Sequence, residues 1–137
     1  MPVYPYGVHS MVCTVERCAV ATVNPLLVPS TLPYGLPDFS AIRDEHVMPA
    51  LQEALRRHKV EIDTIAHDPT TPTAMNTVVA LEQSGQDLSR VVGYFYTVAG
   101  ADATDERLRI EGEISPLLAQ HTDDMYMNAD PVSYTHL

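Results

Sequence analysis

The chain has 137 residues, 45% of them hydrophobic and 19% charged, which is typical of a soluble domain with its own core and not of a disordered chain. A formal net charge of −10 makes nucleic acid and anionic membranes unfavourable partners, because both carry charge of the same sign. No apolar run approaches the roughly 20 residues that cross a bilayer, and no basic region precedes the first apolar stretch as in a secretory signal, so we expect a cytoplasmic protein.

Residues 1–23 have no clean hydrophobic period. We interpret them as an irregular extension, for which a wrongly assigned start codon is one explanation. This extension contains both cysteines of the chain, Cys13 and Cys18. A disulfide framework or a structural zinc site needs more ligands, and the chain has no second cysteine pair, so we predict incidental thiols.

The next segment, residues 24–43, is rich in proline, with prolines at positions 25, 29, 33 and 37. Proline fixes its own φ angle and lacks a backbone donor, so this segment should be neither helix nor central strand. We predict an extended arm that lies across the surface of the domain. Its apolar contacts are expected from four leucines: Leu26, Leu27, Leu32 and Leu36.

Helical periodicity follows the arm. Apolar residues recur at three- and four-residue steps, and the set is Val47, Leu51, Leu55, His58, Ile62 and Ile65. Asp44 is expected to cap the N-terminus of this helix, and Pro49 is tolerated because it falls near the first turn. The helix should end near His67, because Asp68-Pro69 and Pro72 follow.

A second helix is predicted over residues 73–98, with Gly85 and Gly93 inside it. Each internal glycine costs a helix about 1 kcal/mol relative to alanine, so tertiary packing has to compensate, or the glycines let another helix approach closely. The apolar residues of this segment are Val78, Val79, Leu81, Leu88, Val91, Val92, Phe95 and Val98.

A third helix is predicted over residues 104–127, and Pro116 is expected to kink it or split it in two. Its apolar side consists of Leu108, Ile110, Ile114, Leu117, Leu118, His121 and Met125. No segment alternates like a strand. We therefore expect an all-α fold, in which residues 44–130 form about three long antiparallel helices after the proline-rich arm.

None of the histidines completes a metal-binding motif. His46 follows Glu45, but no second histidine makes the HExxH motif of zinc peptidases. His58 lies on the apolar stripe of the first helix, where a packed core histidine is more common than a ligand. His121 and Asp124 share a helical face, but two ligands are too few, because catalytic zinc normally takes three from the protein.

Other candidates are equally weak. Ser84-Gly85 lacks the surroundings of a G-x-S-x-G nucleophile elbow. The aromatic run at residues 94–96 is more typical of a core than of a ligand site, and two carboxylate pairs look like solvated helix faces: Asp123 with Asp124, and Glu111 with Glu113. We predict that this chain has no catalytic, cofactor-binding or metal-ligating residue.

Several segments occur in a distinctive order over residues 24–130. They are Asn24-Pro25-Leu26-Leu27, Leu36-Pro37-Asp38-Phe39, Ile42-Arg43-Asp44-Glu45-His46, Asn76-Thr77-Val78-Val79-Ala80-Leu81-Glu82-Gln83-Ser84-Gly85, and Ile114-Ser115-Pro116-Leu117-Leu118-Ala119-Gln120-His121. This colinear series resembles the N-terminal region of the thimet oligopeptidase family of zinc metallopeptidases. The bacterial dipeptidyl carboxypeptidase and oligopeptidase A branch is the most similar in style.

The resemblance implies a neurolysin-like, almost entirely helical peptidase that hydrolyses short peptides in a deep channel between two lobes. In that family, zinc is held by two histidines of HExxH and a downstream glutamate, and the glutamate within the motif activates water. These residues lie several hundred positions after the matched region, so none of them is assigned to this chain. The chain is expected to be an N-terminal fragment that forms channel wall, binds no zinc, is inactive alone and packs against the missing catalytic region.

The chain departs from the family pattern in three places. Ala74 stands where the family commonly has phenylalanine in Thr-Phe-Glu-Asn-Thr, and residues 1–23 have no counterpart. Residues 131–137 look like translated adapter sequence, and we interpret them as an artefactual tail. Because residues 1–23 have no counterpart in the family, the true N-terminus is in question, and a periplasmic location stays open beside a cytoplasmic one.

Two other functions stay open at this stage. Three amphipathic helices are also compatible with a stand-alone helical module that binds another protein. The six histidines are the single observation behind a small independent metalloenzyme.

Overall fold

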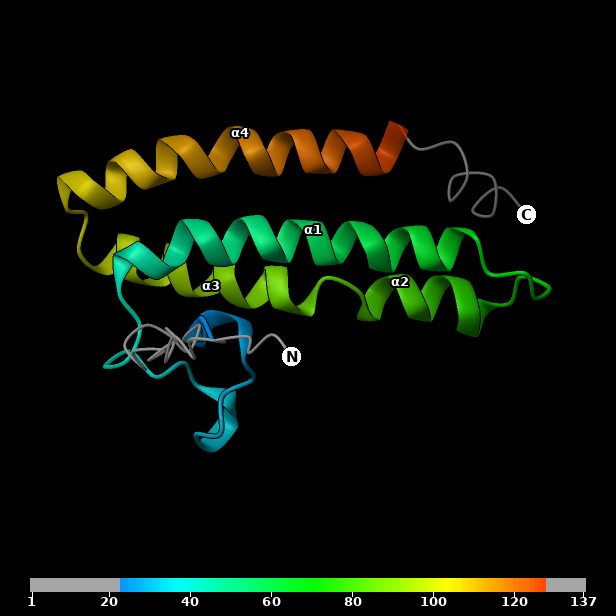
Figure 1. Ribbon diagram of the computed structural model, residues 1–137, viewed down its shortest axis with the longest axis horizontal. Coiled ribbons are helices and arrows are strands. Elements are labelled where there is room, and N and C mark those ends of the chain that lie inside the picture. Colours follow the sequence, from blue (N-terminus) through cyan, green and yellow to red (C-terminus); the bar gives the residue numbers. More distant parts are fainter. Residues whose placement is uncertain (1–22, 128–137) are drawn as a thin grey trace, which may run out of the picture.

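The computed structural model of the chain describes residues 23–127, and within this range the regular elements are helices without strands. The predicted all-α fold is therefore confirmed. The four α-helices are α1 (Val47–Ala66), α2 (Ala80–Gln83), α3 (Gln86–Ala101) and α4 (Asp105–Met127). Helix α1 lies in the middle, with α2 and α3 along one side of it and α4 along the other (Figure 1). Helices α2 and α3 follow one another in the same direction, antiparallel to α1, and α4 turns back again, so α1 and α4 lie side by side in the same direction (Figure 1).

Helix α1 is the spine of this arrangement. A 3₁₀ turn at Asp44–His46 leads into it; Arg43 is the N-cap of this turn, and His46 is the N-cap of α1. The expectation that Asp44 caps the helix is therefore wrong: its carboxylate instead pairs with Arg107 of α4. Pro49 is the third residue of α1, where its missing N–H is not needed, and the helix ends at Ala66 with His67 as its C-cap, both as predicted.

The predicted second helix is not continuous. A wide, π-helical turn at Ala74–Val79 leads into α2, which ends after four residues, and α3 begins at Gln86. Between them, Ser84 is extended and Gly85 has a φ of 69°, in the left-handed region that only glycine adopts without strain. The prediction placed Gly85 inside a helix because the period of the apolar residues carries no information about one residue in the left-handed conformation.

Helix α4 runs through Pro116 without interruption, so the expected split into two helices is wrong (Figure 1). A proline removes the hydrogen bond to the carbonyl four residues earlier, which here belongs to Gly112. Gly112 and Pro116 are both exposed, so water can bind that carbonyl.

One hydrophobic core joins the arm and the three long helices. It contains Leu26, Ile42, Val47, Ala50, Leu51, Ala54, Val91, Tyr94, Phe95, Ala99, Ile110 and Ile114. Half of these twelve residues were expected from the helical periods, but Val78 is 55% exposed and Leu108 is 53% exposed, so their predicted core positions are wrong. Val78 lies in the π-helical turn before α2 and Leu108 in the first turn of α4, where the path of the chain and not the period decides which side faces the core.

The proline-rich arm is extended only in part, because 3₁₀ turns form at Pro25–Leu27 and Pro33–Gly35. Asn24 caps the first turn through its side-chain oxygen, and its amide also donates to the carbonyl of His46 at 2.8 Å. Leu26 is fully buried and Leu27 packs against the core, as predicted. Leu32 and Leu36 are exposed at 43% and 54%, so their predicted contacts are wrong.

Several features of the sequence lie outside the described residues. These are Cys13, Cys18, residues 1–22 of the N-terminal extension and the tail at residues 131–137. In the range that the structure does describe, no helix combines the length and the apolar character needed to span a membrane.

Candidate functional site

The strongest polar network anchors the arm to the helices. Arg90 of α3 donates from Nη1 to the carbonyl of Leu26 at 3.2 Å and to Asp87 at 3.0 Å. The other carboxylate oxygen of Asp87 accepts from Arg57 of α1 at 2.7 Å. Two arginines therefore share one half-buried aspartate, and the three side chains join the arm, α1 and α3. A charge-assisted network of this kind contributes more than an isolated surface pair.

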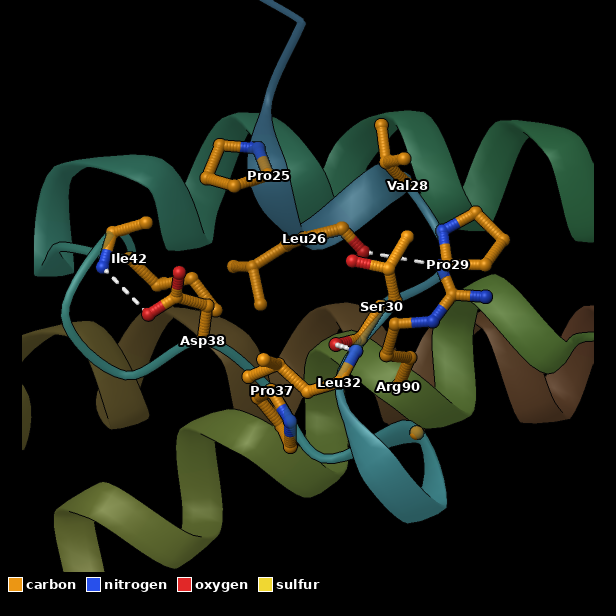
Figure 2. A pocket seen from close by; sticks show the side chains of 13 residues that line it. Pro25, Leu26, Val28, Pro29, Ser30, Leu32, Pro37, Asp38, Ile42 and Arg90 are labelled. Carbon is orange, nitrogen blue, oxygen red and sulfur yellow. Dashed lines mark hydrogen bonds between the residues drawn. The ribbon is translucent and has the colours of Figure 1, made fainter.

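A half-open cavity of about 270 Å³ lies between the arm and α3, next to Arg90 (Figure 2). Its walls are mainly apolar and come from the arm, including Pro25, Leu26 and Ile42. Figure 2 shows Arg90 at the wall with its guanidinium directed to the Leu26 carbonyl, so this cation is already committed to the arm. Ser30 accepts from the backbone N–H of Leu32 at 3.1 Å and donates its hydroxyl proton to the carbonyl of Leu36, while Asp38, the carboxylate among the lining residues, accepts from Ser40. The cavity therefore offers binding space but no catalytic group.

Replacing Arg90 by alanine is expected to lower the free energy of unfolding by about 1–2 kcal/mol, because the buried carbonyl of Leu26 and one oxygen of Asp87 both lose their donor. Chemical denaturation followed by circular dichroism measures this loss. Arg109→Ala is the matched control: its side chain is 57% exposed and pairs only with Glu106 and Glu113 of the same helix. An equal loss in the two variants would contradict the anchoring role of Arg90.

His46 has a local structural role. Its Nδ1 accepts the backbone N–H of Arg43 at 3.1 Å, and its backbone carbonyl accepts from Asn24. Both contacts hold the chain at the start of α1. The aromatic run behaves as the sequence indicated, since Tyr94 and Phe95 are buried in the core while Tyr96 is 39% exposed and packs edge-on against Phe95.

The structure brings three of the candidate residues together. His58 of α1 lies between His121 of α4 and Ser84 of the α2–α3 connection: its Nδ1 is 2.9 Å from His121 Nε2, and its Nε2 is 3.2 Å from Ser84 Oγ. Asp124 lies beside His121 at a small cavity of about 30 Å³ that Lys59 and Asp63 also line. His58 is thus a packed, hydrogen-bonded histidine, as its position on the apolar stripe predicted.

Within residues 23–127, no group of three or more His, Cys, Asp or Glu side chains is arranged to hold a metal ion. Catalytic zinc normally takes three protein ligands. The carboxylates considered in the sequence also lie apart from this cluster: Glu113 pairs with Arg109 on the surface of α4, and Asp123 is exposed.

Sequence reasoning did not identify the two sets of ion pairs that join separate segments of the chain. The helical period places Arg57, Asp87 and Arg90 on polar helix faces without indicating a partner, and the Asp44–Arg107 pair joins residues 63 positions apart. No local pattern links such residues. The one signal in the sequence is that Asp87 and Arg90 are three residues apart on one helical face, and even this does not indicate a contact with the arm.

Comparison with known proteins adds to this picture. No protein-family model matches the chain. Among curated proteins it is similar to bacterial peptidases, and this confirms the relationship to the thimet oligopeptidase family that the colinear segments indicated.

These relatives are dipeptidyl carboxypeptidases. The chain is 40% identical over 111 residues to the enzyme of Escherichia coli (strain K12), a match that covers 81% of this chain and 16% of that protein. It is 43% identical over 108 residues to the enzyme of Salmonella typhimurium (strain LT2), covering 79% of this chain and again 16% of the relative. The chain thus matches only about a sixth of the length of each relative.

Proposed function

We propose that this chain is the N-terminal helical part of a zinc-dependent dipeptidyl carboxypeptidase. It forms part of the wall of the substrate channel and not the catalytic centre. The observation that supports this most is the identity of 40–43% over about four fifths of the chain to two proteins of that name. A match over 108–111 residues of a 137-residue chain is much longer than any one helix, which favours a shared architecture over a shared short motif. The expected substrates are short peptides, and the expected location is the cytoplasm.

In this proposal the hydrolytic chemistry comes from residues beyond this chain. Zinc would polarise the scissile carbonyl and activate water in the catalytic region of the longer polypeptide. The contribution of the residues described above is rigid support: the Arg57–Asp87–Arg90 network and the core around Phe95 hold the arm and the helices in one arrangement. A wall of this kind restricts substrates by size and excludes water from the channel.

The 137-residue chain alone is expected to release no C-terminal dipeptide from a blocked short peptide. A longer polypeptide, which contains this chain and the rest of its reading frame over the length of the Escherichia coli relative, is expected to release dipeptides. Its activity should be lost when a chelator removes the metal and restored by added zinc. Mass spectrometry of the products measures both. Chelator-sensitive hydrolysis by the pure 137-residue chain would contradict the assignment of a wall.

Downstream sequence separates this proposal from a stand-alone binding module. If the proposal holds, an HExxH motif follows in the same reading frame of the source locus. An intact locus with no peptidase sequence after this region, together with a peptidase that co-purifies with the chain, would instead favour a separate module that binds a catalytic partner.

A further inference from the structure

Helix α4 is attached to the rest of the bundle by a polar contact near each end. Near its N-terminal end, Arg107 pairs with Asp44 at 3.1 Å and also donates to the carbonyl of Asp102 at 2.9 Å. Toward its C-terminal end, His121 forms a hydrogen bond to His58 of α1 at 2.9 Å. Arginine stays charged at all physiological pH values, but histidine does not. The two attachments therefore respond differently to pH.

Apolar burial secures only the first part of α4. Ile110 and Ile114 are 2% and 1% exposed, and Leu117 and Leu118 pack against the core. In residues 119–127 every side chain is exposed except those of His121 and Met125, which are half-buried. This last part of α4 is thus held on α1 by two half-buried side chains: Met125, which lines the same small cavity as the buried Ile62 of α1, and His121, which supplies the polar contact to His58.

The hydrogen bonds around His58 determine where its proton lies. Ser84 donates its hydroxyl proton to the carbonyl of Leu81 at 2.7 Å, so its oxygen accepts from Nε2–H of His58. The Nδ1 of His58 then carries a lone pair and accepts from Nε2–H of His121. The neutral pair forms a directional chain from His121 through His58 to Ser84 and the Leu81 carbonyl, in which every donor has one acceptor.

We propose that the His58–His121 contact is a proton-controlled latch that holds the C-terminal part of α4 on α1 and releases it when both imidazoles are protonated. One added proton weakens the latch but keeps the hydrogen bond, because an imidazolium donates to a neutral imidazole. The second proton removes the only acceptor, so that two N–H groups of like charge face each other across 2.9 Å. The two rings titrate as a coupled pair, and the second step opens the latch.

The surroundings set the direction of the pH response. Burial lowers the pKa of His58 and the charge of His121 lowers it further, while Glu61 acts in the opposite direction. Burial likewise lowers the pKa of His121, which Asp124 raises and Lys59 lowers. Asp63 of α1 faces the same small cavity as His121, and the α2–α3 connection contributes the uncharged Ser84. Because both pKa values are lower in the latched state, the latch is fully stabilising above about pH 6.5 and weakens as the pH falls below it.

Geometry also decides which ring moves. A Cβ built on Gly85 would lie 2.9 Å from Nε2 of His58, so the ring of His58 rests directly on the backbone of Gly85. That backbone is held in turn, since its N–H donates to Glu61 at 2.7 Å. His58 is therefore fixed between α1 and the α2–α3 connection, and His121 withdraws together with the end of α4.

Amide hydrogen exchange on the full 137-residue chain tests the latch. Protection of the segment at residues 119–127 is expected to fall roughly fivefold between about pH 7.5 and about pH 5, after correction for the intrinsic exchange rate, while residues 47–54 of α1 keep theirs. In the His121→Gln variant, residues 119–127 are expected to keep their protection at both pH values, because the side-chain amide can both donate and accept a hydrogen bond and does not titrate. In the His121→Ala variant, residues 119–127 are expected to lack this protection at both pH values. His67→Gln removes an exposed histidine that bonds only within α1 and is the control that should behave like the parent chain.

Three results would overturn the latch. One is pH-independent protection of residues 119–127 in the parent chain, and another is parent-like protection in His121→Ala. The third is a loss of protection in residues 47–54 that runs in parallel with that in α4, because this indicates acid unfolding of the whole bundle. None of these readouts requires peptidase activity, so the latch is tested separately from the proposed function.

Discussion

Leu51→Ala is expected to lower the free energy of unfolding by about 2–5 kcal/mol, since it leaves a cavity at the centre of the bundle. Leu51 lies on α1 with a relative exposure of 0%, in the cluster that also contains Phe95 of α3 and Ile114 of α4. A domain of this size has only about 5–15 kcal/mol of net stability, so the loss is a large fraction of the total. Urea denaturation followed by helical circular dichroism measures it.

Leu108→Ala is the matched control, because it makes the same chemical change on α4 at a side chain that is 53% exposed. We expect a change within about 0.5 kcal/mol for this variant. Equal destabilisation by the two substitutions would mean that Leu51 does not lie at the centre of the core.

Gly85→Ala is expected to destabilise the chain by about 1–3 kcal/mol, through left-handed backbone strain and a clash with the ring of His58. The backbone at Gly85 has a φ of 69°, and the added methyl would lie within 3.0 Å of two ring atoms of His58. Thermal denaturation of the variant measures the combined effect. Adding His58→Ala removes the clash but not the strain, so a double-mutant cycle separates the two causes.

Gly93→Ala, at the second glycine of the same predicted helix, is expected to change the stability in the opposite direction to Gly85→Ala. Gly93 lies inside α3, and a Cβ added there would meet nothing within 4 Å, so alanine is expected to stabilise the helix by about 0.5–1 kcal/mol. If both glycine variants were stabilising, the break between α2 and α3 would not depend on Gly85.

The longest helices, α1 and α4, were predictable because apolar residues recur along each of them with a helical period. The end of α1 near His67 follows from the prolines that come after it, and the burial of Ile110 and Ile114 follows from their spacing. Boundaries were less predictable. The break at Gly85 depends on one left-handed residue that sits against His58, and that contact joins positions far apart in the sequence.

The polar sites show the same division. The sequence placed His58 on the apolar face of its helix, and the structure agrees. It did not indicate that His121 would meet His58, because the two are 63 residues apart and the register between α1 and α4 sets their distance. The arm is a similar case. The sequence predicts apolar contacts for Leu26 and Leu36 alike, but only Leu26 is buried, and Arg90 donates a hydrogen bond to its carbonyl.

By itself, the sequence of this protein determined the helical class, the faces of its long helices and the relationship to dipeptidyl carboxypeptidases, all of which depend on local period or on colinear identity. The tertiary structure decided where the second helical segment breaks, which leucines of the arm are buried, and which charged and histidine side chains pair. Those features depend on how separate elements pack in space. Hydrogen bonds form only within about 3.2 Å and ion pairs within about 4 Å, distances that the folded arrangement sets and that no spacing along the chain specifies.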